Sequence, residues 1–496
     1  GGAALLSNAT TSRNTAVGKG ALQANINSDN TAVGYEALND NTTGTQNDAF
    51  GYTSMDKQTT GSYNAAFGAL SAVSLNGGNR NSFFGNSAGS GLTTGSDNVF
   101  LGYKAGNSTT TSDNNVAIGK EALYDNSTGS ENIAIGREAL YATSTNSQNI
   151  AIGYRAGKNV AAPDITYIGH ECGQSTTTGG YNVAVGHRCF RNNTTGFNNT
   201  VMGLGAARLN ETGAYNVAMG YAALYTNVSG GQNIAIGQLA LNVYTGSGTV
   251  AVGNQALQDL TTGIGNVAVG HDAAREITTG QYNTVVGYAA LDASGGDPDY
   301  NVAIGSGSLG KSGFSGGENV CVGHNSGHNI TTGNDNTCIG TNAGDLITTG
   351  LNNIVLGKGA DPVSATVDDT VTLGNASINT LRCTQTSITS LSDRRDKTNI
   401  EDLSIGLDFV NTLRPRKFTW ANRQPNKLDG RTETGFIAQE LQSAEGSIDY
   451  LHLVYDVNPE KLEASQGKLI PILVKAIQDL SAENTALKAR LDAAGL

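Results

Sequence analysis

The sequence predicts a mostly β protein: a parallel β-solenoid (β-roll) of 17-residue repeats, followed by a small α+β domain with a C-terminal coiled-coil helix. Three observations lead to this fold class. One motif recurs 22 times, glycine makes up 66 of 496 residues while only 15% are charged, and the repeats stop before Ser392. We therefore expect a solenoid over residues 1–376, a β-rich connector over 377–391 and a second domain over 392–496.

The repeated motif is Asn-x-Ala-(Ile/Val)-Gly, and its glycine falls at positions from Gly18 to Gly374 with spacings of 16 to 18 residues. The residue before the glycine is apolar in all 22 repeats, and the residue three positions after it is Ala, Ser or Cys in all 22. So strict a period is typical of one solenoid coil per repeat. The many β-branched residues, glycines and asparagines argue against a helical repeat.

Each coil is expected to contain one five-residue strand, for example residues 132–136. Because side chains alternate along a strand, Ile133 and Ile135 would point to one face and Ala134 to the other. Residues 137–140 would return along the coil, and Thr-Thr-Gly turns such as residues 93–95 would link one coil to the next. The small residue three positions after the glycine indicates that two backbones approach closely there.

Two positions of the motif predict how coils and chains pack: the asparagine that opens it and the alanine two positions before the glycine. Asparagine opens the motif in 19 of the 22 repeats, so stacked coils about 4.8 Å apart would form an amide ladder. We place the Ile/Val side chains in the core and the alanines, such as Ala117, on the opposite face. A strand that is apolar on both faces favours burial on both, and three copies around one axis would provide it. The sequence therefore predicts a homotrimer.

Because of the motif Asn-x-Ala-(Ile/Val)-Gly, the repeats over roughly residues 8–378 resemble the head repeats of trimeric autotransporter adhesins. The resemblance implies a left-handed parallel β-roll. This sequence departs from that family in its longer period, and we expect neither a secretion signal nor a C-terminal membrane-barrel anchor.

The residue just after the glycine is aromatic or imidazole in ten repeats. Such a column along the solenoid is a candidate surface for glycans, because aromatic faces accept the C–H surfaces of sugars and their polar tips form hydrogen bonds. A solvated position that favours amphipathic residues is the alternative. The ten residues are Tyr35, Tyr52, Tyr103, Tyr154, His170, His187, Tyr221, His271, Tyr288 and His324.

Other polar and sulfur-containing positions give no firm site. His170 and His187 lie one coil apart, and we favour simple stacking over metal ligation, so no metal or cofactor is predicted. Cys172 pairs in register with Cys189, and Cys321 with Cys338, as small buried thiols rather than disulfides; Cys383 makes the count odd. Asp292, Asp297 and Asp299 fall where one repeat widens, and a solvated loop is favoured there over a calcium site.

The charge balance limits the partners of the chain. A formal net charge of −12 argues against nucleic acid and anionic membranes, since phosphate binding requires clustered Lys and Arg. No stretch has the roughly 18 apolar residues that a membrane helix requires. The opening residues 1–7 lack a basic region, so we expect no signal peptide.

The segment that begins at Ser392 contains three motifs in succession. They are Ser392-Asp393-x-Arg395-x-Lys397-x-x-Ile400, then residues 413–420 (LRPRKFTW) and residues 434–441 (TGFIAQEL). Together they resemble the C-terminal intramolecular chaperone of phage tailspikes and tail fibres, the endosialidase type, which is related to the processing domain of myelin regulatory factor. The resemblance covers residues 392 to about 490. It implies trimerisation, templated folding of the preceding β-structure, and self-cleavage at the Leu391–Ser392 bond with Ser392 as nucleophile and Lys397 as general base. A plain connecting segment is the alternative.

For the rest of this domain we expect a helix over residues 402–413, a strand over 416–420, a helix over 436–444 and a coiled coil over 469–496. The coiled-coil seam comprises Leu473, Ile477, Leu480, Asn484, Leu487 and Leu491. Its spacings of four and three residues are those of a coiled coil, in which a single asparagine often sets register or strand number.

Taken together, the sequence predicts a homotrimeric phage tail fibre, or a fibre of a related injection machine, that binds a glycan or protein receptor on the host cell surface. Its other partners would be tail or baseplate proteins, and it would be made in the host cytoplasm and act in the virion tail, outside the cell. Self-cleavage by the Ser/Lys pair is its one predicted enzymatic activity, with no external substrate. A polysaccharide-depolymerising tailspike and a bacterial trimeric surface adhesin are the alternatives.

Overall fold

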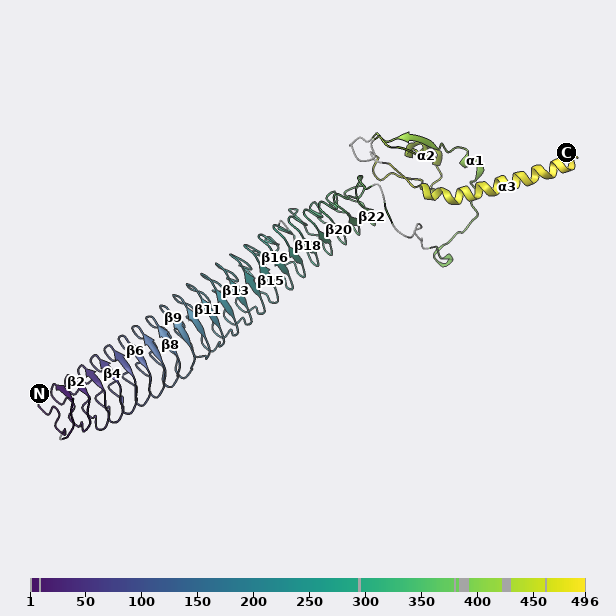
Figure 1. The fold of residues 1–496 in the computed structure, drawn as a ribbon. Coiled ribbons are helices and arrows are strands. Elements are labelled where there is room, and N and C mark those ends of the chain that lie inside the picture. The colour runs from purple at the N-terminus through teal and green to yellow at the C-terminus, as the bar shows by residue number, and fades with distance from the viewer. Residues whose placement is uncertain are drawn as a thin grey trace. The chain divides into compact units, whose positions relative to one another are not determined.

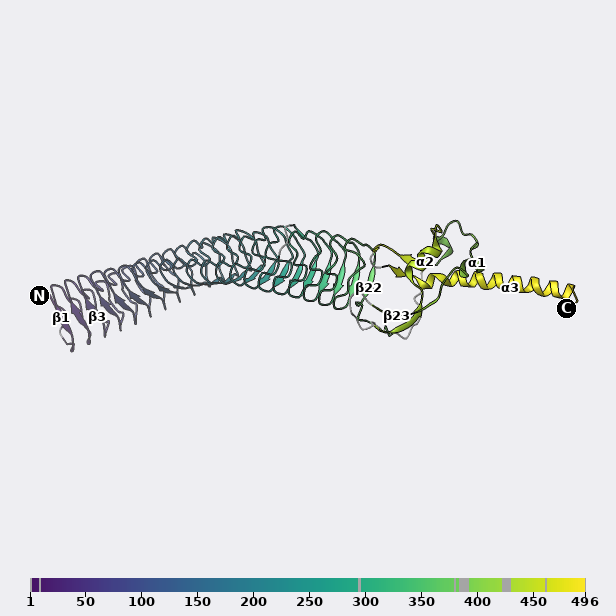
Figure 2. The ribbon, with the colours of Figure 1, turned by 90° about the horizontal axis from the view of Figure 1, so that it is seen from above.

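The computed structural model describes residues 2–8, 10–292, 296–378, 381–382, 392–421, 430–459 and 462–495. The chain divides into two compact units, Gly1–Thr332 and Gly333–Leu496. The predicted connector over 377–391, including Leu391 and Cys383, lies almost entirely outside the described residues. Figures 1 and 2 show the stacked coils, each with its strand on the same side.

Within the described residues, 22 short strands form one sheet in which every resolved pairing is parallel, as the period predicts. Each strand has three residues and pairs in register with the next coil, so that Ala117 lies opposite Ala134. The strands are β1 (Thr15–Val17), β2 (Thr31–Val33), β3 (Asp48–Phe50), β4 (Ala65–Phe67), β5 (Ser82–Phe84), β6 (Val99–Leu101), β7 (Val116–Ile118), β8 (Ile133–Ile135), β9 (Ile150–Ile152), β10 (Thr166–Ile168), β11 (Val183–Val185), β12 (Thr200–Met202), β13 (Val217–Met219), β14 (Ile234–Ile236), β15 (Val250–Val252), β16 (Val267–Val269), β17 (Thr284–Val286), β18 (Val302–Ile304), β19 (Val320–Val322), β20 (Thr337–Ile339), β21 (Ile354–Leu356) and β22 (Val371–Leu373).

The glycine after each strand ends it, which is why the strands are shorter than the predicted five residues. Gly102 has φ +137°, a conformation that side-chain-bearing residues rarely adopt. A Cβ on Gly102 would lie 2.6 Å from the carbonyl oxygen of Gly119 in the next coil. The closest approach of two backbones therefore occurs at the glycines, while the small residues three positions later, such as Ala105, are fully buried in the core.

The strands present their Ile and Val side chains outward, which is the reverse of our prediction. In β6, Val99 and Leu101 are 41% and 45% exposed, whereas Phe100 between them is fully buried. In β14 the buried residue is Ala235. The predicted assignment of the Ile/Val columns to the core is wrong because the coil is thin: a small residue between them fills the space against the return arm. We call the residues one and three positions before each glycine the outer columns, and those two positions before it the inner column.

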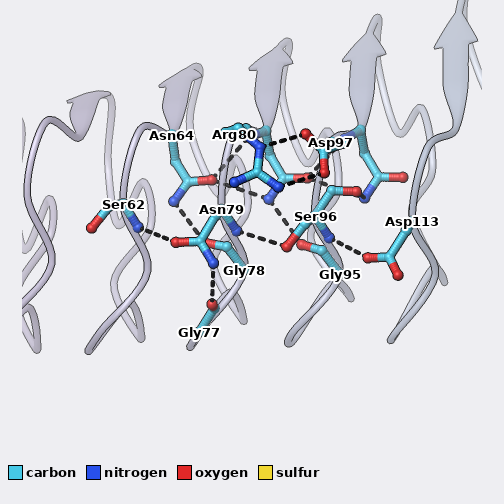
Figure 3. A network of polar contacts seen from close by, with 12 residues as sticks. Ser62, Asn64, Gly77, Gly78, Asn79, Arg80, Gly95, Ser96, Asp97 and Asp113 are labelled. Carbon is cyan, nitrogen blue, oxygen red and sulfur yellow. Dashed lines mark hydrogen bonds and ion pairs between the residues drawn. The ribbon is translucent and has the colours of Figure 1, made fainter.

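The buried asparagines form the predicted ladder. Asn47 Oδ1 accepts a hydrogen bond from the backbone N–H of Asn64 (3.1 Å) and another from its Nδ2 (3.1 Å). The Nδ2 of Asn64 also donates to the carbonyl oxygen of Gly78 in the following coil (2.8 Å). A second ladder at the turn, shown in Figure 3, links Ser62 to Asn79 by a backbone-to-side-chain bond of 2.9 Å. Each coil thus satisfies the polar groups of its neighbour.

The return arm, which we define as the six residues after each glycine, is not a regular strand. Its residues alternate into the left-handed region, as Glu138 (φ 57°) and Leu140 (φ 47°) show. This alternation points the amide of Glu138 to the carbonyl of Lys120 in the preceding coil (3.0 Å), and the amide of Leu140 to that of Ala156 in the following coil (3.1 Å). Both arms of each coil are therefore hydrogen-bonded to neighbouring coils.

Large and small residues compensate each other across the thin core. Where the inner column holds Phe100 in place of the usual alanine, the fourth residue of the return arm is Gly106 in place of leucine. A Cβ on Gly106 would lie 2.5 Å from the Phe100 ring. Phe83 with Gly89 and Tyr167 with Gly173 repeat the arrangement, so a large inner residue is compensated within its own coil at these three places.

In the second unit, the residues after Ser392 form a small α+β fold. Its elements are the 3-10 turns η1 (Arg394–Asp396) and η2 (Gln466–Lys468), the helices α1 (Leu407–Val410), α2 (Ala438–Glu445) and α3 (Leu469–Ala493), and the strands β23 (Arg416–Thr419), β24 (Thr432–Gly435), β25 (Val454–Tyr455) and β26 (Glu463–Ala464). Strands β23 and β24 pair antiparallel, as do β25 and β26. The core gathers Phe409, Leu441, Leu451, Leu453, Leu469 and Ile472.

The predicted helix over 402–413 is wrong in extent, since α1 covers only Leu407–Val410. Gly406 precedes its first residue, and the backbone N–H of Leu407 donates a hydrogen bond to the carboxylate of Asp479 in α3 (3.3 Å). Leu403 and Ile405 instead pack on the core in non-helical conformation. The predicted strand 416–420 and helix 436–444 correspond to β23 and α2.

We predict that Phe100→Ala and Gly106→Leu each lower the thermal unfolding midpoint, whereas the double variant recovers most of the loss. The first change leaves a cavity, which costs roughly 3–5 kcal/mol. The second overpacks the coil and costs roughly 1–3 kcal/mol. Together they recreate the Ala117/Leu123 pair of the next coil. Additive losses in calorimetry would contradict compensation across the core.

Candidate functional site

The ten candidate residues after the glycine, which we call the aromatic column, form an exposed line along the first unit. Nine are exposed and Tyr154 is half-buried. Neighbours stack: the ring centroids of Tyr35 and Tyr52 lie 5.3 Å apart, and those of His170 and His187 4.9 Å apart. The stacking of the two histidines is the arrangement that the sequence favoured over metal ligation.

Cations fill several of the gaps between the rings. The Lys120 ammonium lies 5.8 Å from the centroid of the Tyr103 ring, and the Arg137 guanidinium 5.7 Å from that of Tyr154. Tyr154 lies 5.0 Å from His170 in a tilted arrangement, and His170 stacks on His187, so the contacts run unbroken from Arg137 to His187. His271 and Tyr288 form a separate pair at 5.5 Å. Within the described part of the first unit, Tyr221 and His324 touch no neighbouring ring of the column.

An ion-pair network lies beside the column, and sequence reasoning missed it. The buried carboxylate of Glu138 is within 2.8 Å of Lys158, 2.9 Å of Arg155 and 3.0 Å of Arg137. Burial alone would raise the pKa of Glu138, but the hydrogen bonds from Lys158 and Arg155 outweigh it and lower that pKa to about 2. The signal was present in the sequence: at the second position of the return arm, Glu138, Arg155, Glu171 and Arg188 alternate in charge at spacings of 16 or 17 residues.

The cysteines and the acidic insertion occupy structural positions. The described thiols, of Cys172, Cys189, Cys321 and Cys338, are buried, and burial raises the pKa of Cys172. Asp297 accepts hydrogen bonds from the hydroxyl (2.6 Å) and amide (2.7 Å) of the neighbouring coil at residues 278–279. It thus caps the coil beside it.

The junction segment folds back on itself in the turn η1. The carboxylate of Asp393 accepts a hydrogen bond from the backbone N–H of Arg395 (2.8 Å) and forms an ion pair with the guanidinium of the same residue (2.6 Å). That guanidinium lowers the pKa of Asp393. The turn brings Lys397 Nζ to 2.5 Å from Ser392 Oγ, in an exposed position. The structure thus joins the two predicted catalytic side chains, whereas Leu391, on the other side of the predicted cleavage bond, lies outside the described residues.

Residues 392–449 match the family model described as chaperone of endosialidase, Peptidase_S74. The match begins at the serine of the junction. A comparison with curated proteins finds no match. The segment after the solenoid is thus similar to this intramolecular chaperone family, in agreement with the resemblance seen in the sequence motifs.

Within the segment that matches this chaperone family, the two motifs 413–420 and 434–441 lie together. The first contains β23, and the second contains the end of β24 and the first half of α2. Strands β23 and β24 pair antiparallel, with Arg416 as the register partner of Gly435. The Arg416 guanidinium binds both carboxylate oxygens of Glu440 in α2, at 2.9 and 2.6 Å, and lowers the pKa of Glu440. Pro415, Lys417, Phe436 and Gln466 line a recess of about 460 Å³ beside them.

No helix of the described residues is long and apolar enough to cross a membrane.

We predict that the stabilisation from Glu138 is lost as the pH falls from about 4.5 towards 2. Its folded-state pKa of about 2 lies below the ordinary 4.5, so the charged form stabilises the fold above the unfolded-state pKa and must be protonated below it. At pH 7 we expect Glu138→Gln to cost on the order of 2–3 kcal/mol. The difference from wild type should vanish near pH 2 in denaturation curves. Glu211→Gln, at an exposed carboxylate, is the control, and an equal effect of both would contradict the assignment.

Proposed function

We propose that the protein is a homotrimeric tail fibre or tailspike of a bacteriophage, or of a related injection machine, and that it binds the surface of a host cell. The observation that carries this proposal is the presence, in one chain, of a 22-strand β-solenoid and a segment that matches the chaperone of endosialidase. Such a fibre is made in the host cytoplasm and acts outside the cell in the virion tail. Its other partners are tail or baseplate proteins.

The exposed outer columns support trimerisation. The row one position before the glycine holds only Ile, Val, Leu, Phe and Met side chains, and the parallel row three positions before it is Ile or Val in most coils but Thr, Ala, Ser or Asp48 in the others. Phe50, Phe67 and Phe84 stack on one another in one row at 4.7 Å. Over the 19 strands of the first unit such a stripe is about 90 Å long and roughly 7 Å wide. A continuous apolar surface of this size marks a protein interface.

The C-terminal helix provides a second apolar surface for association. Leu469, Ile472 and Ala476 of α3 are buried in the small domain. On the helix face predicted to be the coiled-coil seam, Ile477 is 67% exposed and Leu487 is 51% exposed. Three such helices in parallel would bury this face and place Asn484 in the seam, where it helps to set the register.

The aromatic column lies on the return arm, on the other side of the glycine from the outer columns of the strand. We propose that host binding by this column leaves the apolar stripe free for the partner chains. We assign to the column the receptor contact, to a glycan or a protein, and to residues 392–496 the chaperone role. The aligned ends of three chains would then set the register of the coils that precede them.

We also propose that the chain cleaves itself between Leu391 and Ser392. In the structure the Lys397 ammonium donates to Ser392 Oγ, and the neutral amine would accept the hydroxyl proton instead. The Oγ then attacks the carbonyl carbon of Leu391, the proton passes to the leaving α-amine of Ser392, and water hydrolyses the resulting ester. The products are a carboxylate at Leu391 and a free amine at Ser392.

We predict that the full chain is a trimer in light scattering, and that Ile234→Lys combined with Ile236→Lys yields monomers or aggregates. Two ammonium groups in the middle of the apolar stripe cannot be desolvated cheaply. Gln238→Lys, two residues further on the return arm, is the matched control and should remain a trimer. A monomeric wild-type chain would refute the proposed assembly.

We predict that wild type gives two bands on a denaturing gel, and that Ser392→Ala and Lys397→Ala each give one full-length band. Removing the nucleophile or its base abolishes the acyl transfer, which depends on both groups. Ser404→Ala, an equally exposed serine in the same domain, should cleave as wild type does. Identical patterns for wild type and Ser392→Ala would exclude cleavage at this serine.

A further inference from the structure

A hollow of about 420 Å³ interrupts the return-arm face of the first unit near Tyr221. It arises from two missing side chains. The second position of the return arm is Gly205 in one coil and Ala222 in the next, whereas Arg188 and Leu239 occupy this position in the coils on either side. Since coils are about 4.8 Å apart, these two residues stand roughly 14 Å apart along the solenoid. The hollow is long enough for one or two sugar rings.

The long walls of the hollow combine aromatic and cationic groups. His187, Leu204 and Tyr221 line one side, at the position of the aromatic column, and Arg208 and Tyr225 line the other. The ring of Tyr221 is 53% exposed, and within the described part of this unit no other ring of the column covers it. An aromatic face beside an open hollow is the arrangement that the C–H surface of a pyranose requires.

The cations at the hollow exceed the carboxylates beside them. Arg188 and the neighbouring Arg191 share a single carboxylate, that of Glu171, at 3.0 and 3.2 Å. Arg208 has no carboxylate partner: its guanidinium donates to Tyr225 Oη (2.9 Å), and its buried Nε has no hydrogen-bond partner in the described structure.

The sequence around the hollow has the same imbalance. Residues 171–258 contain three arginines, two glutamates and no lysine or aspartate, a net charge of +1 in a chain whose total is −12. A cationic hollow in an acidic protein favours an anionic ligand over a neutral one. Guanidinium groups bind carboxylates with paired, charge-assisted hydrogen bonds.

We propose that this hollow binds an acidic saccharide unit, with the sugar ring against Tyr221 and its carboxylate on Arg208 and Arg188. The inference rests on the proposed role in host binding, and it assigns that role a ligand class and a position. In a trimer each fibre would present three such hollows, so weak individual contacts would add up to firm attachment.

The test titrates the full chain with a glucuronosyl-N-acetylglucosamine disaccharide and with the glucosyl disaccharide of the same linkage, followed by calorimetry or ligand-observed NMR. We expect the acidic disaccharide to bind on the order of tenfold more tightly than the neutral one, because only its carboxylate meets the arginines. Raising the salt concentration should weaken its binding.

Two variants address the hollow by different routes. Arg208→Gln removes the charge, and Ala222→Gln fills the space with a side chain that Gln255 already carries at the same position and a similar φ. Each should weaken binding of the acidic disaccharide on the order of tenfold or more. Arg191→Gln, in the coil of Arg188 but outside the lining, removes the same charge and should weaken binding less than Arg208→Gln does. The proposal fails if wild type binds neither disaccharide or binds both equally, or if neither Arg208→Gln nor Ala222→Gln affects binding.

A second arm separates this proposal from the proposed function. Wild type and Ala222→Gln are compared for binding to a panel of purified bacterial surface polysaccharides, both acidic and neutral. Selective loss of acidic polysaccharides by Ala222→Gln supports the hollow. Equal binding by both proteins overturns the hollow but leaves host binding intact. If wild type binds no polysaccharide yet binds the acidic disaccharide, the hollow stands and the proposed glycan receptor falls.

Discussion

The structure depends on hydrogen bonds between coils. The amide of Asn64 accepts and donates only through atoms of the coils on either side of it. The strands also bond to neighbouring coils, and the return arm adds bonds within its own coil, such as that from the amide of Ala139 to the carbonyl of Gly136. A buried amide without partners costs roughly 1–3 kcal/mol, so an isolated repeat is unstable and a stack is stable. The glycines make this possible, because any Cβ at Gly102 would keep the adjacent coils apart.

The same regularity leaves a problem of alignment. Nearly identical coils can stack one repeat out of register and still form every hydrogen bond of the ladder, so the ladder by itself would not define which coils lie side by side in the trimer that we propose. A domain outside the repeats must supply that information. A segment similar to the chaperone of endosialidase and an exposed apolar helix face on α3 are suited to this task, which gives a physical reason for both parts to belong to one chain.

The thin core divides the surface of each coil between two kinds of interaction. Alanine inside and Ile or Val outside produce an apolar strand face, while the return arm has the charges, the aromatic column and the hollow. A mutation on one face should therefore leave the other intact. The return arm is free to vary because its second and fifth side chains do not enter the core, which is how Gly205 and Ala222 open a hollow without disturbing the ladder.

The sequence by itself determined the repeat, the one strand per coil, the asparagine ladder and the chaperone-like segment, because these are strictly periodic or local patterns. It also placed Ser392 and Lys397 five residues apart, close enough for one turn to join them. It did not determine which strand face is inside. Ala134 and Ile135 are both apolar, and successive side chains alternate between the two faces whichever face is buried. Only the tertiary structure decided this, because the narrow space between the two arms suits alanine and accommodates a residue as large as Phe100 where the return arm has Gly106. In the same way, the shortness of α1 depends on Asp479, which is distant in sequence, and the hollow depends on side-chain sizes in four successive coils.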